Sequence, residues 1–159
     1  MYTKPTPAFI GVSYCAMSIG MAAFLTGLWR TTSMGLAEKG FYFTLLMYGL
    51  YAAVSVQKSV RDRTENIPVT DLYYGISWLS TIMCLSLLII GLWNANWPLS
   101  EKGFYGMSFL LSLFGAIAVQ KNTRDVAGLH RLVNRPVADA SLPERPHPDR
   151  PLVDRSKKS

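Results

Sequence analysis

Charged side chains are scarce in this sequence, and four long stretches of it contain none. Only 16% of the 159 residues are charged, whereas an ordinary soluble domain carries about 25%. Half of the residues are hydrophobic, and they gather in uncharged blocks with the charges between and after them. This distribution argues against an ordinary soluble enzyme and is typical of a membrane protein.

Histidine and cysteine are also scarce. His130 and His147 both lie in the polar C-terminal segment, while Cys15 and Cys84 lie inside apolar blocks. This excludes a disulfide framework and the usual metal-ligand spacings, and no motif for nucleophilic or phosphoryl-transfer chemistry is present. Basic residues flank the apolar blocks instead of alternating with aromatic ones, which excludes the usual nucleic-acid pattern. We expect no catalytic residue, no metal, no cofactor and no nucleic-acid partner.

The four uncharged blocks predict four transmembrane helices, at about residues 9–29, 40–57, 72–93 and 103–120. A bilayer core requires about 20 apolar residues in a helix, and lysines flanking the two shorter blocks can extend to the interface. A signal peptide is the competing interpretation of the first block, but its apolar run is longer than usual and lacks a clear cleavage site. The short links at 30–38 and 94–101 predict two helical hairpins.

The sequence contains an internal repeat. Residues 36–62 and 99–125 are identical at 13 of 27 positions, and Gly-Leu-Trp at 27–29 recurs at 91–93. We therefore divide the chain into a first repeat at 1–66, a second repeat at 67–125 and a tail at 126–159. Each repeat has an even number of spans, so the two hairpins are expected to be parallel, with a pseudo-two-fold axis along the membrane normal. Many transporters use inverted repeats instead, which makes a transporter less favoured.

The basic residues predict the orientation of the chain. Thirteen of the sixteen lysines and arginines fall at the N-terminus, in the 58–71 link or from Lys121 onward, and three fall in the hairpin links. The positive-inside rule then places both termini in the cytoplasm. The tail is rich in proline, arginine and aspartate, and such a composition cannot bury enough apolar surface to fold. We expect a disordered cytoplasmic tail after residue 125; the alternative for its first residues is that the fourth helix continues into 126–133.

The repeated motifs also carry a family resemblance. The order Gly-Leu-Trp, then Leu-x-Glu-Lys-Gly-Phe-Tyr, then Val-Gln-Lys-x-x-Arg-Asp occurs twice at matching spacing. It resembles the YiaA/YiaB family of bacterial inner-membrane proteins, which are built from the YiaAB two-helix domain, over about residues 8–125. The resemblance implies a multi-pass inner-membrane protein and no reaction, so it supplies no catalytic residue.

The repeated polar residues are the candidate functional positions. They form one group at the predicted outer end of the second helix of each repeat and another group at its inner end: Glu38, Lys39, Gly40, Tyr42, Gln57, Lys58, Arg61 and Asp62, with Glu101, Lys102, Gly103, Tyr105, Gln120, Lys121, Arg124 and Asp125. Helix-dipole and interfacial anchoring explain all of them. The alternatives are a cation or proton site formed by Glu38 and Glu101, and a basic pocket at the inner end for a phosphate-bearing lipid or metabolite.

Small residues predict where the second helices of the two repeats pack. Gly49-xxx-Ala53 and Ser112-xxx-Ala116 occupy equivalent positions, and small residues four apart let membrane helices approach closely. We expect these two helices to contact each other through these faces.

The sequence favours a non-enzymatic membrane protein that acts by association with itself, with lipid or with another membrane protein. The alternative is a small transporter or channel with a path at the repeat interface, lined by Gln57, Gln120, Glu38 and Glu101. A third hypothesis is a membrane enzyme or one of its subunits. The spans contain no internal charge, and proton or ion pathways usually need one.

Overall fold

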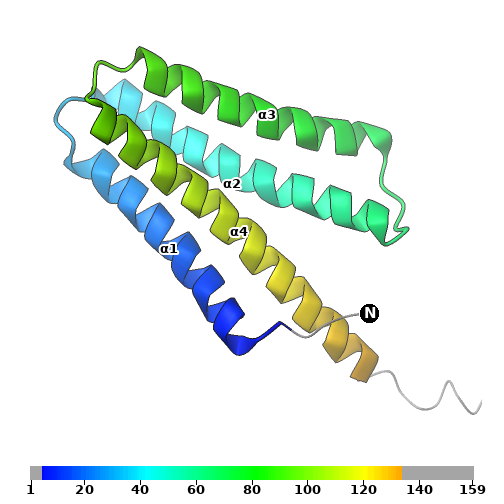
Figure 1. The fold of residues 1–159 in the computed structure, drawn as a ribbon. Helices are drawn as coiled ribbons and strands as arrows, with labels where there is room; N and C mark the ends of the chain where they lie inside the picture. Colours follow the sequence, from blue (N-terminus) through cyan, green and yellow to red (C-terminus); the bar gives the residue numbers. More distant parts are fainter. Residues whose placement is uncertain (1–4, 134–159) are drawn as a thin grey trace, which may run out of the picture.

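The computed structural model describes residues 5–133, with side chains for 5–128. All regular structure in this range is helical: α1 (Pro7–Arg30), α2 (Leu36–Thr64), α3 (Asp71–Asn94) and α4 (Leu99–Val133). At 1.5 Å per residue, the 24 residues of α1 extend for about 36 Å. This all-α architecture agrees with the sequence-based prediction (Figure 1).

The first helix of each repeat begins with the same cap. Thr6 precedes α1 and accepts a hydrogen bond from the Phe9 amide at 3.3 Å, and Thr70 precedes α3 and accepts one from the Tyr73 amide at 3.3 Å. A threonine side chain at this position satisfies one of the unpaired amides of the first turn. Pro7 follows Thr6 at the first helical position, where its missing N–H costs nothing. The repeat thus includes the residues that cap the N-termini of α1 and α3.

The second helices begin differently. At the start of α2 the Glu38 carboxylate accepts a hydrogen bond from the Gly35 amide at 3.0 Å, which is half of a capping box. Pro98 stands at the position equivalent to Gly35 and has no amide proton. Its carbonyl accepts bonds from the amides of Glu101 and Lys102 at 3.0 and 3.2 Å, as the Gly35 carbonyl accepts one from the Lys39 amide at 3.0 Å. Glu101 therefore does not repeat the contact that Glu38 makes.

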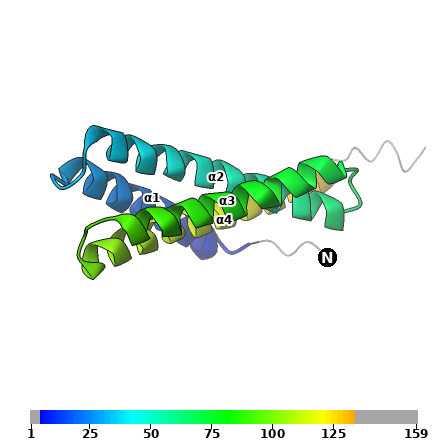
Figure 2. The same cartoon turned by 90° about the horizontal axis from the view of Figure 1, so that it is seen from above.

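The closest helix pairs join different repeats. α1 packs most extensively on α4, and α2 packs on α3, while α2 and α4 meet in the middle. Helices that are consecutive within one hairpin contact each other only slightly. Figure 1 shows the resulting order α3, α2, α4 and α1 across the bundle, and Figure 2 shows the α1–α2 and α3–α4 links together at one end. We call this end the hairpin end, and the end with the α2–α3 link the opposite end.

The hydrophobic core lies where the α1–α4 pair packs against the α2–α3 pair. Phe24 of α1, Leu46 of α2 and Phe109 of α4 are fully buried, and Leu88 of α3 is 4% exposed. Phe24 and Phe109 pack as a tilted aromatic pair with ring centroids 5.7 Å apart. Each repeat therefore contributes to one common core.

The outer surface is apolar. Large side chains on α3, including Leu79, Ile82 and Ile89, are more than half exposed. In water such a surface would cause aggregation or binding, and against lipid it is satisfied. Within the part of the chain that the structure describes, three helices are long and apolar enough to cross a membrane: α1, α3 and residues 99–128 of α4. α2 is not among them, because Tyr42, Tyr48, Tyr51 and Gln57 lower its mean hydropathy.

α4 is the longest helix and continues to Val133. It therefore extends eight residues beyond Asp125, so the division at residue 126 falls inside α4 and the alternative of a helix continuing through 126–133 holds. The remainder of that expected tail, 134–159, lies outside the described residues.

Candidate functional site

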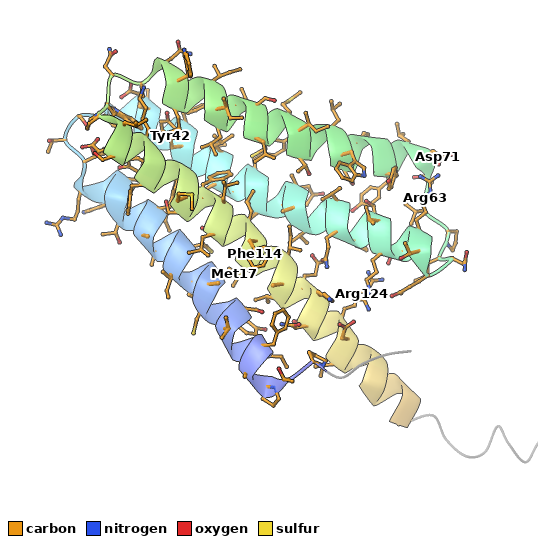
Figure 3. All side chains as sticks on the ribbon, viewed as in Figure 1. Met17, Tyr42, Arg63, Asp71, Phe114 and Arg124 are labelled. Atoms are coloured by element: carbon orange, nitrogen blue, oxygen red, sulfur yellow. The ribbon has the colours of Figure 1, made fainter. Side chains whose placement is uncertain are left out.

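Two crossed ion pairs join the repeats at the opposite end. Arg61 of α2 donates to Asp125 of α4, with Nη2 and Oδ1 2.5 Å apart, and Arg124 of α4 donates to Asp62 of α2. Each Arg-Asp motif thus pairs with the copy of itself. Asp62 is only 7% exposed, so these contacts are better shielded from water than a surface pair. We call these four residues the ion-pair clamp; Arg124 is labelled in Figure 3.

Arg61 has a second carboxylate partner. Its Nε donates to Glu65 Oε1 at 2.7 Å, one turn further along α2. The hydrogen bond with Glu65 and the contact with Asp125 raise the pKa of the Arg61 guanidinium above its ordinary value, against an opposing effect of burial. The group stays protonated at all physiological pH values, so it acts as a fixed charge and not as a proton carrier.

The remaining residues of the inner motif have different environments. Lys58 and Lys121 are exposed, as lipid-anchoring cations would be. Gln57 lines a shallow groove of about 430 Å³ with Arg61 and Trp78. The Oε1 atom of Gln120 is buried and has no hydrogen-bond partner among the described residues. The structure therefore joins the arginines and aspartates of this motif but not its lysines.

Three aromatic rings close the hairpin end. The ring centroid of Trp97, in the α3–α4 link, lies 5.4 Å from Tyr42 and 5.3 Å from Tyr105. The two tyrosines occupy the same position in the two repeats and stack at 6.4 Å. Both are nearly buried, at 4% and 3% exposure. We call Tyr42, Trp97 and Tyr105 the aromatic cap (Figure 3 labels Tyr42).

The glycine of each Gly-Leu-Trp motif packs against the Phe-Tyr pair of the other repeat. A Cβ atom added at Gly27 would lie 2.7 Å from the Phe104 ring and 3.3 Å from the Tyr105 hydroxyl. One added at Gly91 would lie 3.1 Å from both the Phe41 ring and the Tyr42 hydroxyl. These glycines are needed for close approach. The two motifs that recur together in sequence are therefore contact partners across the repeats.

The lysines of the outer motif bind the end of the preceding helix. Lys39 Nζ donates to the Trp29 carbonyl at 3.5 Å, and Lys102 Nζ donates to the Trp93 carbonyl at 3.3 Å. The last carbonyls of a helix have no partner within it and carry partial negative charge. Each lysine thus fastens the two helices of its own hairpin. Gly40 and Gly103 are exposed on the helix surface, and a Cβ atom added at either would meet no other part of the protein within 4 Å.

The two outer glutamates have different surroundings. Glu38 is exposed and caps α2. Glu101 is half-buried and lines a groove of about 390 Å³ between α1 and α4, together with Arg30 and Thr31. Glu101 thus lines a groove, whereas the carboxylate of Glu38 accepts the hydrogen bond of a helix cap.

The predicted helix-packing residues are buried but face two different neighbours. A Cβ atom added at Gly49 would lie 2.8 Å from Phe109 and 3.3 Å from Leu113, both on α4. Ser112 instead contacts α1, because a Cβ atom at Gly20 would lie 2.6 Å from the Ser112 amide. Ala53 and Ala116 are 2% and 7% exposed. Small residues permit close approach, but they do not determine which helix approaches.

Gly115 has the closest neighbour of any described glycine, and this contact was not predicted from the sequence. A Cβ atom at Gly115 would lie 2.4 Å from the Met17 backbone nitrogen, so α1 and α4 touch through their backbones here (Met17 is labelled in Figure 3). Nearby, Asn122 donates to Ser13 Oγ at 3.0 Å in a buried contact between the same two helices. One signal in the sequence points to this contact: Ser112 and Gly115 are three residues apart, so two small residues share a face of the fourth helix and allow another helix to approach closely.

Comparisons with known proteins agree with the repeat. The family model described as the yiaA/B two helix domain (YiaAB) matches the chain twice, at residues 9–62 and 73–125. The chain is also similar to the inner membrane protein YiaA of Escherichia coli (strain K12), with 53% identity over 125 residues. That alignment covers 79% of this chain and 85% of the relative. No solved structure matches. The resemblance inferred from the repeated motifs is confirmed.

Proposed function

This chain belongs to the YiaAB two-helix-domain family, and we propose that it is a four-span inner-membrane protein that acts by association and not by catalysis. The relative named above is an inner membrane protein, which supports the same location here. Its partners would be lipid, a second copy or another membrane protein. One observation carries the proposal: the repeated Arg-Asp pairs and the repeated tyrosines hold the two repeats together.

The contacts of these residues leave little chemistry available. The ion-pair clamp neutralises its own charges, the two lysines bind helix-end carbonyls, and Glu38 caps a helix. The repeat interface itself is filled by Leu46, Phe109 and the aromatic cap, which disfavours a solute path along it. The apolar outer surface of α1 and α3 remains available, and such surfaces bind lipid or other helices.

The fourth span of the proposal is α2. Its 29 residues extend for about 44 Å, and it lies between α3 and α4 along their length (Figure 1). Neighbouring helices cover part of its polar surface, since Tyr42 is only 4% exposed, whereas Tyr51 is 67% exposed. With all four helices crossing, both termini lie on the same side, and the basic residues favour the cytoplasm.

Reporter fusions test this topology. A periplasm-active phosphatase fused after Ser33 should be active, and the same enzyme fused after Asn66 or after Asp125 should be inactive. A fluorescent protein that matures only in the cytoplasm should give the reciprocal pattern. Activity of the phosphatase after Asn66 would contradict a membrane-spanning α2, and activity after Asp125 alone would contradict the cytoplasmic C-terminus.

Native mass spectrometry of the protein, purified gently from its own membrane, tests the proposed function. We expect a self-oligomer, a retained lipid or a bound membrane protein at defined stoichiometry. Liposomes containing the protein should show no solute flux above that of protein-free liposomes. A bare monomer that conducts a solute, with flux reduced by the double change Glu38→Gln and Glu101→Gln, would overturn the proposal in favour of a channel.

A further inference from the structure

Two grooves adjoin on the surface between α1 and α4, close to the hairpin end. One has a volume of about 390 Å³ and a mixed lining that includes the charged residues Arg30 and Glu101. The other is apolar, measures about 550 Å³ and is lined by Ile19, Ala22 and Phe104. They share Gly27, Arg30 and Phe104, so together they form one groove with a polar head and an apolar tail.

The length of the groove matches one leaflet of a bilayer. From Ile19 to Arg30 the α1 helix rises about 17 Å. The hydrocarbon core of a bilayer is about 30 Å thick, so one leaflet contributes about 15 Å. An acyl chain lying along this groove would therefore begin at the level of Arg30 and end near the middle of the membrane. The polar head of the groove then lies at the depth of the lipid headgroups.

The charges in the polar head have opposite signs. Arg30 supplies a cation and Glu101 an anion, with Thr31, Ser100 and Tyr105 around them. Within the described residues the two charged groups form no ion pair with each other. Guanidinium groups bind phosphate oxygens through charge-assisted hydrogen bonds, and carboxylates accept such bonds from ammonium groups. A cation beside an anion thus suits a ligand that carries a phosphate and a protonated amine.

The other repeat shows that these charges are specific to this groove. Asn94 stands at the position of Arg30, and its side chain donates to the Ile90 carbonyl at 2.9 Å. Glu38 stands at the position of Glu101, and its carboxylate accepts from the Gly35 amide. Pro98 replaces Gly35 in the second repeat and offers Glu101 no amide proton. The sequence differences between the repeats therefore leave both a cation and a carboxylate available on the α1–α4 side.

We propose that this groove binds one phospholipid with a primary-amine, zwitterionic headgroup of the phosphoethanolamine class. Arg30 binds its phosphate, Glu101 accepts hydrogen bonds from its ammonium group, and one acyl chain lies along Ile19, Ala22 and Phe104. A purely anionic headgroup would be repelled by Glu101, and a choline headgroup has no N–H to donate to it. The inference rests on the proposed association function, since it names lipid as one partner.

Lipid titration followed by native mass spectrometry tests the proposal. The full chain in detergent is titrated separately with phosphatidylethanolamine, phosphatidylglycerol and phosphatidylcholine of identical acyl chains. We expect the first bound phosphatidylethanolamine to be held at least about fivefold more tightly than either of the others. Equal affinity for all three lipids would overturn the proposal.

Variants locate the binding to this groove. Arg30→Asn, which copies the residue of the other repeat, should weaken phosphatidylethanolamine binding about fivefold or more. Glu101→Gln should do the same and should also raise the affinity for phosphatidylglycerol, because the repelling carboxylate is gone. The matched control Glu38→Gln should leave both affinities unchanged. A merely structural role of Glu101 would not reverse the lipid preference.

The outcomes separate this inference from the proposed function. Unselective lipid binding by a protein that still forms a defined oligomer or partner complex would overturn the lipid site alone. Unchanged lipid preference in Arg30→Asn and Glu101→Gln would also overturn it. Solute flux through a bare monomer would instead overturn the proposed association function.

Discussion

Glycines at the α1–α4 junction illustrate how single residues determine this fold. Gly20 and Gly115 lie on different helices, and each faces the backbone of the other helix at a distance that excludes a side chain. In a membrane, helices associate through such close packing because lipid supplies no hydrophobic force between them. The packing of α1 on α4 therefore depends on the absence of side chains at these two glycines.

Gly115→Ala is expected to destabilise the protein by about 1–3 kcal/mol, the usual cost of overpacking. The new methyl group would lie 2.4 Å from the Met17 nitrogen, and a backbone atom cannot move aside as a side chain can. Unfolding of the purified protein in mixed micelles, titrated with a denaturing detergent, measures the change.

Gly103→Ala provides the matched control on the same helix. Nothing lies within 4 Å of a Cβ atom at this position, and alanine favours the helix more than glycine does. The control should be neutral or slightly stabilising. Equal destabilisation by both substitutions would contradict the backbone contact at Met17 and indicate a general effect of alanine on α4.

At the scale of the helices, the contribution of an ion pair to stability depends on how deeply the pair is buried. In the ion-pair clamp, Asp125 and Arg61 have side chains that are 15% and 18% exposed. Arg63 and Asp71 form another pair at the α2–α3 link, with 52% and 88% exposure and an N–O distance of 2.7 Å (Figure 3). Exposed pairs contribute little because water and salt screen them, whereas removing one partner of a buried pair leaves a charge without compensation.

Asp125→Asn should therefore cost about 1–3 kcal/mol of stability, since it leaves Arg61 with a weaker acceptor. Asp71→Asn should cost about 0.5 kcal/mol or less. The same detergent titration compares the two variants. The exchange Arg61→Asp with Asp125→Arg should recover part of the loss, and a double variant no better than the sum of its single changes would contradict a direct pair.

The sequence predicts helices better than it predicts their partners. Uncharged blocks located all four helices, because burying a charge in lipid is costly whatever the packing. The Arg-Asp and Phe-Tyr motifs were identified as candidates, but their pairing across repeats depends on how helices cross. Gly49 and Ser112 illustrate the limit: a small residue indicates that some neighbour comes close, and only the fold shows that Ser112 meets Gly20 of α1.

The groove proposed for lipid illustrates a second limit. Glu38 and Glu101 occupy identical motifs, so sequence comparison treats them as equivalent. Their difference arises from Gly35 and Pro98, three residues earlier, because only Gly35 has an amide proton that the carboxylate can cap. Arg30 belongs to no repeated motif, and its proximity to Glu101 follows from the packing of α1 on α4.

At the scale of the whole molecule, the two repeats interlock instead of standing side by side. Gly20 on α1 faces Ser112 on α4, and at the equivalent junction Cys84 on α3 faces Gly49 on α2. Each junction thus combines one glycine with one larger residue. Pairing the first repeat with itself would place Gly20 against Gly49 and leave a gap, and pairing the second with itself would place Cys84 against Ser112 and crowd the helices.

This complementarity predicts that the halves of the protein prefer each other. Residues 1–67 and 68–159, expressed together as separate chains with different tags, should copurify as a mixed pair. The mixed pair should exceed either self-pair at least about fivefold, which corresponds to about 1 kcal/mol, because a gap and a clash each cost about that much. Ile67 and Pro68 are exposed in the α2–α3 link, so the break itself removes no core contact.

A matched change should shift this preference in a defined direction. With Cys84→Gly and Ser112→Gly together, the second repeat no longer crowds its own copy, and its self-pairing should increase relative to the mixed pair. Cys15→Gly, on the exposed face of α1, is the control and should leave the ratio unchanged. If the original halves pair with themselves as often as with each other, the complementary junctions do not determine how the repeats assemble, and the order of helices must instead depend on the intact α2–α3 link.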